Sequence, residues 1–413
     1  MTASEIEIMA PVGSYGSLRA AMQGGADSVY FGIGKLNMRS RSSNNFTTDD
    51  LAEISKICRE KNIRTYITLN TIVYDSELEE MKTIVDAAKN NHISAIIASD
   101  LSVIQYARSQ NVEVHMSTQS NITNIEAVKF WANFADVMVT ARELSLEKVK
   151  KITQQIKEEQ IKGPSGNLVQ IEVFAHGALC MAVSGKCYLS LDNLNFSANR
   201  GACLQVCRRG YTVKDKESDL ELQVDNEYIM SPKDLKTLDF IDKIMDAGVR
   251  VLKIEGRGRQ GDYVKTVTSV YREAVDAYFT GNFTKENIEK WNKKLATVYN
   301  RGFWDGYYLG RKTGEWTEQY GSVATKRKEY VGKVTNYYSK IGVAEIKMET
   351  KQLSVGDEIQ ITGPTTGVYE DVIKEIRVDK KNVEQTVKGE FCSIPTTTLV
   401  RRMDKVFRVF DAE

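Results

Sequence analysis

Short apolar runs alternate with amphipathic stretches over roughly the first 260 residues of the chain. The apolar runs are rich in Val, Ile, Tyr and Phe and are bounded by polar residues, which is typical of buried strands. The intervening stretches, such as residues 48–61 and 76–90, repeat apolar residues at helical spacing. Strands that alternate with helices predict a parallel sheet, because each helix carries the chain back to the start of the next strand.

Eight candidate strands precede residue 260, and their number favours a closed barrel. They cover residues 6–10, 28–32, 64–69, 95–98, 112–116, 136–140, 169–174 and 250–254. Eight strand–helix units in about 255 residues match a TIM-type (β/α)8 barrel. The alternative is an open doubly wound sheet, whose dinucleotide-binding form has three glycines in the first turn. Here Pro11-Val-Gly13-Ser-Tyr-Gly16 lacks the third glycine, so the barrel is preferred.

The chain is expected to divide near residue 311. Residues 1–311 would form the barrel with trailing helices, residues 312–328 a linker, and residues 329–413 a small C-terminal all-β barrel, since strands and turns alternate there. The gap between the seventh and eighth strands is long. Its insertion, about residues 176–230 with an expected hairpin over 211–228, would hang from the C-terminal rim, where such barrels carry active sites.

Composition and charge indicate an ordinary globular protein. Hydrophobic residues make up 42% of the chain and charged residues 27%. A net charge of +1 provides no global attraction for nucleic acid, so an RNA partner would need a local basic patch. The N-terminus lacks the features of a signal peptide, and no apolar run approaches the roughly 20 residues of a membrane span. We expect a cytoplasmic protein with no membrane contact.

Four of the six cysteines lie within 28 residues of the insertion. Six residues separate Cys180 from Cys187, and three separate Cys203 from Cys207. In a reducing compartment, thiolates this close together indicate a metal rather than disulfides. Structural zinc favours CxxC pairs, whereas wider spacing suits the larger cage of an iron–sulfur cluster. The spacing favours iron–sulfur, with zinc as the alternative, and the position at the rim associates the metal with the chemistry.

Polar residues at the predicted strand ends indicate a polar cavity in the barrel mouth, because buried charges must be paired or used. The richest run is Lys253-Ile-Glu255-Gly-Arg257-Gly-Arg259, whose arginines could grip a carboxylate or a phosphate. His176 ends the seventh strand near the first clustered cysteine and is a candidate catalytic group. Further candidates for substrate binding are Arg39, Asn70, Gln119, Arg142 and Glu172. The alternative for each is a helix cap or a loop support.

Three local basic clusters are candidates for RNA contact. They contain Arg208 and Arg209 after the last clustered cysteine, Arg327, and Arg401 with Arg402. Solvated faces often carry such runs, but arginines that adjoin a thiolate nest are harder to explain in that way.

The cysteine-rich stretch resembles the signature of peptidase family U32. It runs from His176-Gly-Ala-Leu-Cys180 through Ser184-Gly-Lys-Cys187 to Asn199-Arg-Gly-Ala-Cys203 and Cys207-Arg208. Three further segments agree: Met9-Ala-Pro-Val-Gly13 with Gly25-Ala-Asp27, then Leu252-Lys-Ile-Glu-Gly-Arg257, then Asn300-Arg-Gly-Phe303. The resemblance covers about residues 1–310, and the β module is similar to the C-terminal domain of longer members.

Members of this family were first labelled collagenase-like proteases, but the resemblance implies oxygen-independent hydroxylation supported by a four-iron cluster. The branch that this chain resembles most makes 5-hydroxyuridine at the tRNA wobble position with prephenate as donor. Other branches hydroxylate a ribosomal RNA cytidine or ubiquinone precursors. Carried across, Cys180, Cys187, Cys203 and Cys207 become ligands of a 4Fe-4S cluster. The implied partners are the tRNA anticodon arm and a small dicarboxylate, with a protein partner or a homo-oligomer left open.

This resemblance suggests roles for residues in the barrel mouth. Glu255 or His176 would handle protons, and Arg257 or Arg259 would anchor the dicarboxylate. The target base would enter the mouth unstacked, because chemistry at a ring carbon requires a flipped base. A hydrolase with structural zinc remains an alternative, although no HExxH or GxSxG motif is present. A catalytic triad can be scattered in sequence. A third reading is a non-catalytic RNA-binding subunit.

Overall fold

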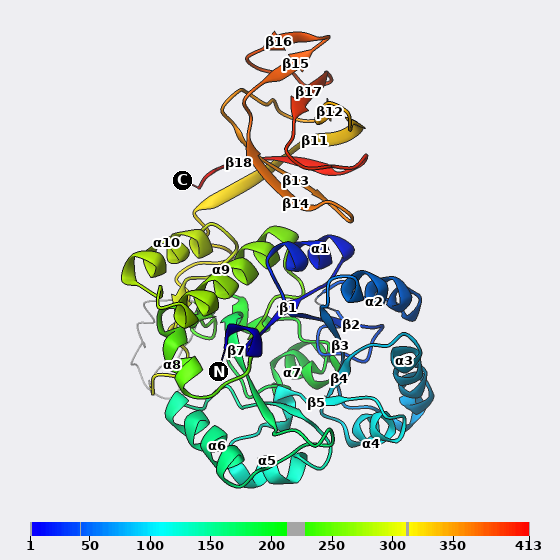
Figure 1. Ribbon diagram of the computed structural model, residues 1–413, viewed down its shortest axis with the longest axis vertical. Coiled ribbons are helices and arrows are strands. Elements are labelled where there is room, and N and C mark those ends of the chain that lie inside the picture. Colours follow the sequence, from blue (N-terminus) through cyan, green and yellow to red (C-terminus); the bar gives the residue numbers. More distant parts are fainter. Residues whose placement is uncertain (1, 42, 213–227, 311–313, 413) are drawn as a thin grey trace.

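The computed structural model describes residues 2–41, 43–212, 228–310 and 314–412, which form a barrel and a separate β region (Figure 1). The barrel strands pair in parallel in chain order, and the first also pairs with the last, which closes the barrel. These strands are β1 (Glu7–Pro11), β2 (Ser28–Gly32), β3 (Arg64–Leu69), β4 (Ala95–Ala98), β5 (Val114–Met116), β6 (Val137–Val139), β7 (Gln170–Gly177) and β9 (Val251–Ile254). The predicted barrel and its strand positions are confirmed.

Helices cover the outside of the barrel (Figure 1). They are α1 (Tyr15–Gln23), α2 (Leu51–Arg59), α3 (Leu78–Asn90), α4 (Leu101–Ser109), α5 (Ile125–Trp131), α6 (Leu146–Glu158), α8 (Ile241–Asp246) and α9 (Gly261–Phe279), followed by α10 (Lys285–Ala296). The helices that follow barrel strands bury an apolar face, which in α2 includes Leu51, Ile54 and Ile57, whereas α10 packs on α9. Side-chain caps start several of them, as where Ser14 accepts from the backbone N–H of Ser17.

Charged side chains close the N-terminal end of the barrel. The Arg64 guanidinium lies 3.3 Å from a carboxylate oxygen of Glu7 and 3.1 Å from one of Glu113. Tyr66 Oη donates to Glu7 at 2.8 Å, and His115 Nε2 lies 2.9 Å from Glu113. These groups pair with one another at the starts of the strands, so their charges are satisfied within that end of the barrel.

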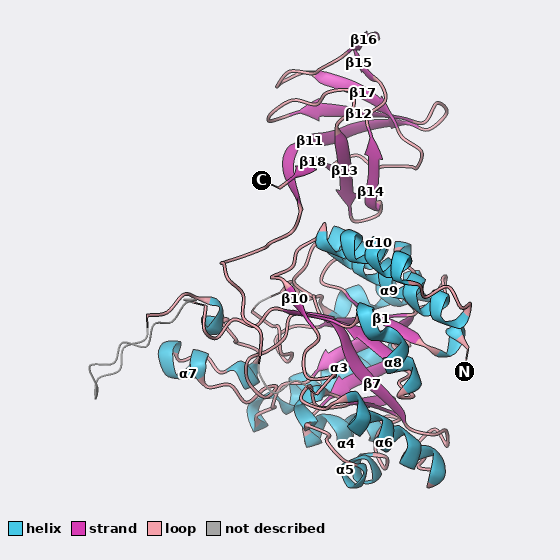
Figure 2. Ribbon diagram, turned by 90° about the vertical axis from the view of Figure 1, so that its left-hand side faces the viewer, coloured by secondary structure: helices cyan, strands magenta, loops and turns pink. Residues whose placement is uncertain are grey.

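The insertion after the seventh barrel strand carries the clustered cysteines. Its described residues include α7 (Leu189–Leu194) and β8 (Asp234–Lys236), which runs antiparallel to β7 and parallel to β10 (Phe303–Trp304). Figure 2 shows α7 standing off the barrel on the side away from the N-terminus. Most of the expected hairpin over 211–228 lies outside the described residues.

The C-terminal region is an antiparallel sheet around its own core, which confirms the predicted all-β region. Val331, Val334, Ile346 and Ile361 are fully buried in this core. The strands follow the order β14-β13-β18-β11-β12-β17-β15-β16. They are β11 (Lys326–Tyr338), β12 (Val343–Met348), β13 (Glu358–Gly363), β14 (Gly367–Val372), β15 (Ile376–Val378), β16 (Lys381–Val383), β17 (Phe391–Pro395) and β18 (Lys405–Asp411). No helix in the described parts of the chain is long and apolar enough to cross a membrane.

The β region contacts the barrel through α1 and α9 (Figures 1 and 2). Gln23 Nε2 donates to the carbonyl of Thr366 at 3.0 Å. On α9, Lys265 Nζ lies 2.7 Å from a carboxylate oxygen of Glu370. One β-hairpin therefore touches both the first and the last helix that follow barrel strands.

Candidate functional site

A cavity of about 120 Å³ lies at the C-terminal end of the barrel, where the loops after several strands meet the cysteine-rich insertion. Seven residues predicted from the sequence line it. They are Arg39, Asn70, Gln119, Arg142, Lys253, Glu255 and Arg257. Six come from loops that follow barrel strands and Lys253 from β9 itself, over more than 200 positions of the chain. Parallel strands bring them together because all their carboxyl ends face the same way.

All four clustered cysteines line this same cavity. Each is a free thiol, and Cys180 is the most exposed of them. Burial raises the pKa of the Cys207 thiol; Arg208 lowers it, and the other three clustered cysteines raise it further. The four thiols are therefore close enough to influence one another across one space.

The four thiols line one cavity but come from two separate stretches of the insertion. Among the described residues, no three His, Cys, Asp or Glu side chains are placed to hold one metal ion. A closed zinc site needs four donors about 2.0–2.3 Å from one centre. An iron–sulfur cluster instead takes one thiolate on each iron, so its ligands stand farther apart around a larger body.

Two residues of the cysteine signature dock the insertion on the barrel. Arg200 forms an ion pair with Glu77, and its guanidinium lies 4.1 Å from the ring centroid of Tyr74. Gly201 has a φ of +74°, and a Cβ there would lie 2.2 Å from the backbone oxygen of Asn37. Only glycine allows this close approach, so the Arg-Gly pair before Cys203 holds the insertion against the loop that carries Arg39.

The charges in the cavity are unequal, with Arg39, Arg142, Lys253 and Arg257 against Glu255. Arg39 Nη2 donates to Glu255 Oε1 at 2.8 Å. Burial alone would raise the pKa of Glu255, but Arg39, Arg142 and Arg257 outweigh burial and lower it to about 2. A carboxyl with this pKa carries no proton near neutral pH. Glu255 is therefore a counter-ion for the arginines, and in this ionised form the carboxyl group has no proton to donate, so proton handling by Glu255 would be limited to accepting one.

Arg257 is fixed in the cavity wall and is only 5% exposed. Its Nη1 donates to Thr68 Oγ1 at 2.8 Å and its Nη2 to Asn37 Oδ1 at 3.1 Å. Burial lowers the pKa of Arg257 to about 10. At the end of β2, a Cβ on Gly32 would lie 2.4 Å from Nη1, so a glycine at this position makes the space for the guanidinium.

Lys253 is held by Glu172, which lies behind the cavity wall. Its Nζ is 2.7 Å from Glu172 Oε1 and 4.7 Å from the ring centroid of Tyr30. Glu172 was predicted to bind substrate; its fully buried carboxylate instead orients the lysine that lines the cavity. Arg142 places its guanidinium 3.9 Å from the ring centroid of Phe174.

An uncharged hydrogen-bonding wall completes the cavity. Asn70 Nδ2 donates to Ser117 Oγ at 3.2 Å and to Gln119 Oε1 at 3.3 Å. Tyr30 and Thr68 were not singled out from the sequence, because they read as ordinary strand residues, and Ser117, directly after β5, was not singled out either. The available signal was strand alternation, since Tyr30 and Thr68 fall on inward-facing positions near the carboxyl ends of β2 and β3.

Two predicted site residues besides Glu172 lie outside the cavity, namely His176 and Arg259. His176 is 1% exposed and packs its ring 5.6 Å from that of Tyr271 and 5.5 Å from that of Phe303. Burial, with a contribution from Lys236, lowers the pKa of His176 to about 3. Arg259 leaves the barrel mouth, and its guanidinium lies 3.4 Å from the ring centroid of Tyr299. Neither position fits the role expected of it in this cavity.

The arginines predicted to contact RNA differ in their surroundings. Arg208 is half-buried and donates to the carbonyl of Leu179 at 2.7 Å and to Ser231 Oγ at 3.1 Å, so it ties the insertion together. Burial lowers the pKa of Arg208 to about 10. The remaining four are exposed, namely Arg209, Arg327, Arg401 and Arg402.

Comparison with known proteins shows similarity along the whole chain. The sequence model of peptidase family U32 matches residues 13–318. A Porphyromonas gingivalis protein named collagenase is 58% identical over 408 residues, 99% of each chain. A tRNA hydroxylation protein of Bacillus subtilis is 31% identical over 380 residues, 90% of this chain and 86% of its own. A 23S rRNA 5-hydroxycytidine synthase of Escherichia coli is 34% identical over 278 residues, 67% of this chain and 40% of its own.

Proposed function

This chain belongs to peptidase family U32, and from that premise we propose that it is an iron–sulfur-dependent RNA hydroxylase that needs no molecular oxygen. The proposed substrate is the wobble uridine of tRNA, the product 5-hydroxyuridine, and the donor prephenate. One observation carries the proposal: four free thiols and four cationic side chains line a single cavity in the barrel mouth. The relatives named for tRNA and rRNA hydroxylation support the choice of RNA.

The cysteines Cys180, Cys187, Cys203 and Cys207 would hold a 4Fe-4S cluster beside the cavity. When bound, such a cluster supplies electron transfer or an iron atom that binds substrate. Replacing a ring C–H by C–OH adds one oxygen atom and removes two electrons from the base. The donor must therefore release an oxygen atom and accept those electrons, and we assign both tasks to prephenate.

The cationic wall suits a donor with carboxylates. Arg142 and Lys253 flank the cavity, and the buried Nε of Arg142 has no hydrogen-bond partner among the described residues. A bound carboxylate would satisfy this donor, since guanidinium–carboxylate hydrogen bonds are among the stronger ones in proteins. Glu255 and Glu172 keep Arg39 and Lys253 in place, so that the charge is already oriented before the donor arrives.

The uncharged wall suits a pyrimidine. Asn70, Ser117 and Gln119 present amide and hydroxyl groups that can donate to and accept from the edge of a uracil ring. Their position in the barrel mouth requires the nucleotide to leave its stack, as in other enzymes that act on a base. The exposed Arg209, Arg327, Arg401 and Arg402 would contact the phosphates of the anticodon arm.

Nucleoside analysis of tRNA tests the proposal. In a strain that lacks the gene and has no second route to the product, 5-hydroxyuridine-type nucleosides should be absent. The wild-type chain should restore them, Cys203→Ala should not, and Cys392→Ala, at a buried cysteine of the C-terminal core, should. Unchanged nucleosides in the deletion strain would contradict the tRNA assignment, and the same analysis of ribosomal RNA would detect a cytidine substrate.

A second candidate is a peptidase, favoured by the name of the 58% identical relative. The cavity offers it little chemistry: no histidine stands among its described lining residues, and Glu255 is held as an ion-paired carboxylate. Gelatin cleavage by anaerobically purified protein decides between the two. A colourless, zinc-containing protein that cleaves gelatin would replace the hydroxylase proposal.

A further inference from the structure

A second polar cavity, of about 400 Å³, lies beside the loop that follows β9. Side chains and backbone from three segments line it, namely Ser14, Arg41, Ser43, Asn44, Arg259 and Gln260. Arg257 also contributes to its wall, so this cavity adjoins the one that contains the cysteines. The proposed hydroxylation assigns it no role.

The second cavity carries positive charge without a matching acid. Its described lining includes no Asp or Glu, although the chain as a whole has 56 basic and 55 acidic residues. The guanidinium of Arg41 lies 4.5 Å from the ring centroid of Phe196, and that of Arg259 lies 3.4 Å from that of Tyr299. Neither arginine has a carboxylate partner among the described residues. Both are held by aromatic rings that leave their N–H groups available to a ligand.

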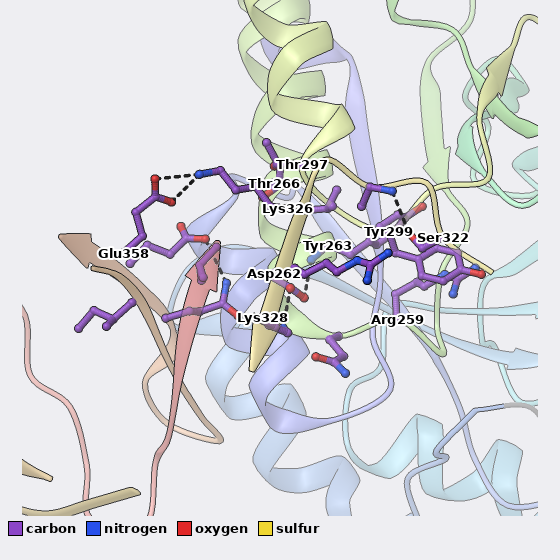
Figure 3. A pocket seen from close by; sticks show the side chains of 18 of the residues that line it. Arg259, Asp262, Tyr263, Thr266, Thr297, Tyr299, Ser322, Lys326, Lys328 and Glu358 are labelled. Carbon is purple, nitrogen blue, oxygen red and sulfur yellow. Dashed lines mark hydrogen bonds and ion pairs between the residues drawn. The ribbon is translucent and has the colours of Figure 1, made fainter. Parts of the chain in front are cut away.

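The neighbouring cavity between barrel and β region shows the opposite arrangement (Figure 3). There Lys326 Nζ lies 2.8 Å from Glu358, and Lys328 Nζ lies 2.5 Å from Asp262. The figure shows Arg259 turned toward Tyr299, away from these ion pairs. The lysines of that cavity are already neutralised. Arg259 lines both cavities, whereas Arg41 lines only the second, so Arg41 is the unpaired arginine that distinguishes the second cavity as an anion site.

Backbone donors add to the arginines. Two helices begin at the second cavity: α1, of 9 residues, follows its N-cap Ser14, and α9, of 19 residues, follows its N-cap Gln260. Helix N-termini carry partial positive charge and free N–H groups. A Cβ on Gly13 would lie 2.3 Å from the backbone oxygen of Arg257, so the two loops meet this closely only because residue 13 is glycine.

We propose that the second cavity binds a phosphate group. Two arginines and two helix N-termini approach from different elements, which matches a tetrahedral group with several acceptor oxygens better than a planar carboxylate. The loop after the last strand of a TIM-type barrel is also a frequent phosphate position. The phosphate belongs either to an RNA backbone that passes the barrel mouth or to a small phosphorylated molecule. Binding of the phosphate itself does not depend on the proposed hydroxylation.

Calorimetric titration of the full-length protein with inorganic phosphate tests the site. At low ionic strength the wild type should bind one phosphate per chain. A double variant that combines Arg41→Gln and Arg259→Gln should bind phosphate at least tenfold more weakly. Arg59→Gln, at an exposed arginine at the end of α2, should leave the affinity unchanged. Arg41→Gln alone should give an intermediate loss of phosphate affinity. This single variant still tests the site if the double variant folds poorly. Equal affinity in wild type and both variants would overturn the proposal, as would no saturable binding.

Competition identifies the source of the phosphate. If an RNA backbone occupies the cavity, inorganic phosphate competes with tRNA, and the salt dependence of tRNA binding should fall by about one unit of slope for each arginine removed. If a small phosphorylated molecule occupies it, phosphate and tRNA bind together and the double variant retains the wild-type tRNA affinity. Neither result requires hydroxylase activity, so failure here can be told apart from failure of the proposed function.

Discussion

Arg39 and Glu255 form an ion pair of 2.8 Å across the barrel mouth, between residues 216 positions apart in the chain. Glu255 raises the pKa of Arg39 despite its burial, and Cys203 and Cys180 add to the effect. The pair therefore joins the loops after the second and last barrel strands directly beside the cysteines. Its two members belong to the same site although no local pattern in the sequence connects them.

Replacing Glu255 by Gln should destabilise the protein. The substitution leaves Arg39, Arg142 and Arg257 without their shared counter-ion, and the loss of a hydrogen bond between charged groups at a largely buried position costs about 1.5–3 kcal/mol. Urea denaturation, monitored by circular dichroism, measures this loss of unfolding free energy. Glu147→Gln, which breaks an exposed pair with Lys151 on α6, should have little effect. Equal stability of Glu255→Gln and wild type would show that the carboxylate is dispensable.

The same carboxylate gives stability a defined pH dependence. The pKa of Glu255 is about 2 in the folded protein and near 4.3 in an unfolded chain. Its contribution is therefore complete above about pH 5 and is lost as the pH falls toward 2. The difference in unfolding free energy between wild type and Glu255→Gln should shrink over this range. A difference that stays constant from pH 6 to pH 3 would contradict the pairing.

His176 should destabilise the protein in moderately acidic solution. Its pKa is about 3 in the folded protein and about 6.5 unfolded, so the unfolded chain takes up the proton first. Stability is complete above about pH 6.5 and declines as the pH falls toward 3. His176→Phe should remove part of this decline, whereas His92→Asn, at an exposed turn, should preserve it. Thermal melting at half-unit pH steps distinguishes the two variants.

A single methyl group at Gly32 should disturb the side chains that form the cavity wall. In Gly32→Ala the new Cβ would lie 2.4 Å from Arg257 Nη1 and 2.4 Å from Asn45 Oδ1. Overpacking of this kind typically costs about 1–3 kcal/mol, and it should move Arg257 out of the cavity wall. The free energy of unfolding, measured by urea denaturation, and the yield of the modified nucleoside should both fall. Gly314→Ala, whose Cβ would meet Trp316 at an ordinary 3.4 Å, serves as the control and should change neither.

Iron content should depend on the clustered cysteines alone. Anaerobically purified wild type should contain about four iron and four sulfide per chain and absorb in the visible range. Cys187→Ala should lose most of the iron, while Cys58→Ala, at a buried cysteine of α2, should retain it. Stoichiometric zinc without sulfide in the wild type would show that the thiols hold a different metal.

The eight barrel strands could be predicted because strand and helix patterns are local in the sequence. The cavity residues at strand ends followed from the same pattern, since parallel strands present their carboxyl ends together. The direction in which each loop side chain points could not be predicted. His176 is four positions from Cys180 yet packs against Tyr271, and Arg259 is two positions from Arg257 yet faces another cavity. Pairings such as Lys253 with Glu172 depend on neighbouring strands, which only the closed sheet brings into contact.

The hairpin of β13 and β14 rests where the barrel closes on itself. Closure joins β1 to β9, the pairing with the longest intervening chain in the barrel, and the entropy lost in joining chain ends grows with that length. Gln23 on α1 and Lys265 on α9 flank this seam, and both hold the hairpin. The C-terminal region thus bridges the two helices beside the junction whose closure spans the most chain. Any separation of β1 from β9 would also take Glu255, which follows β9, away from Arg39, which follows β2.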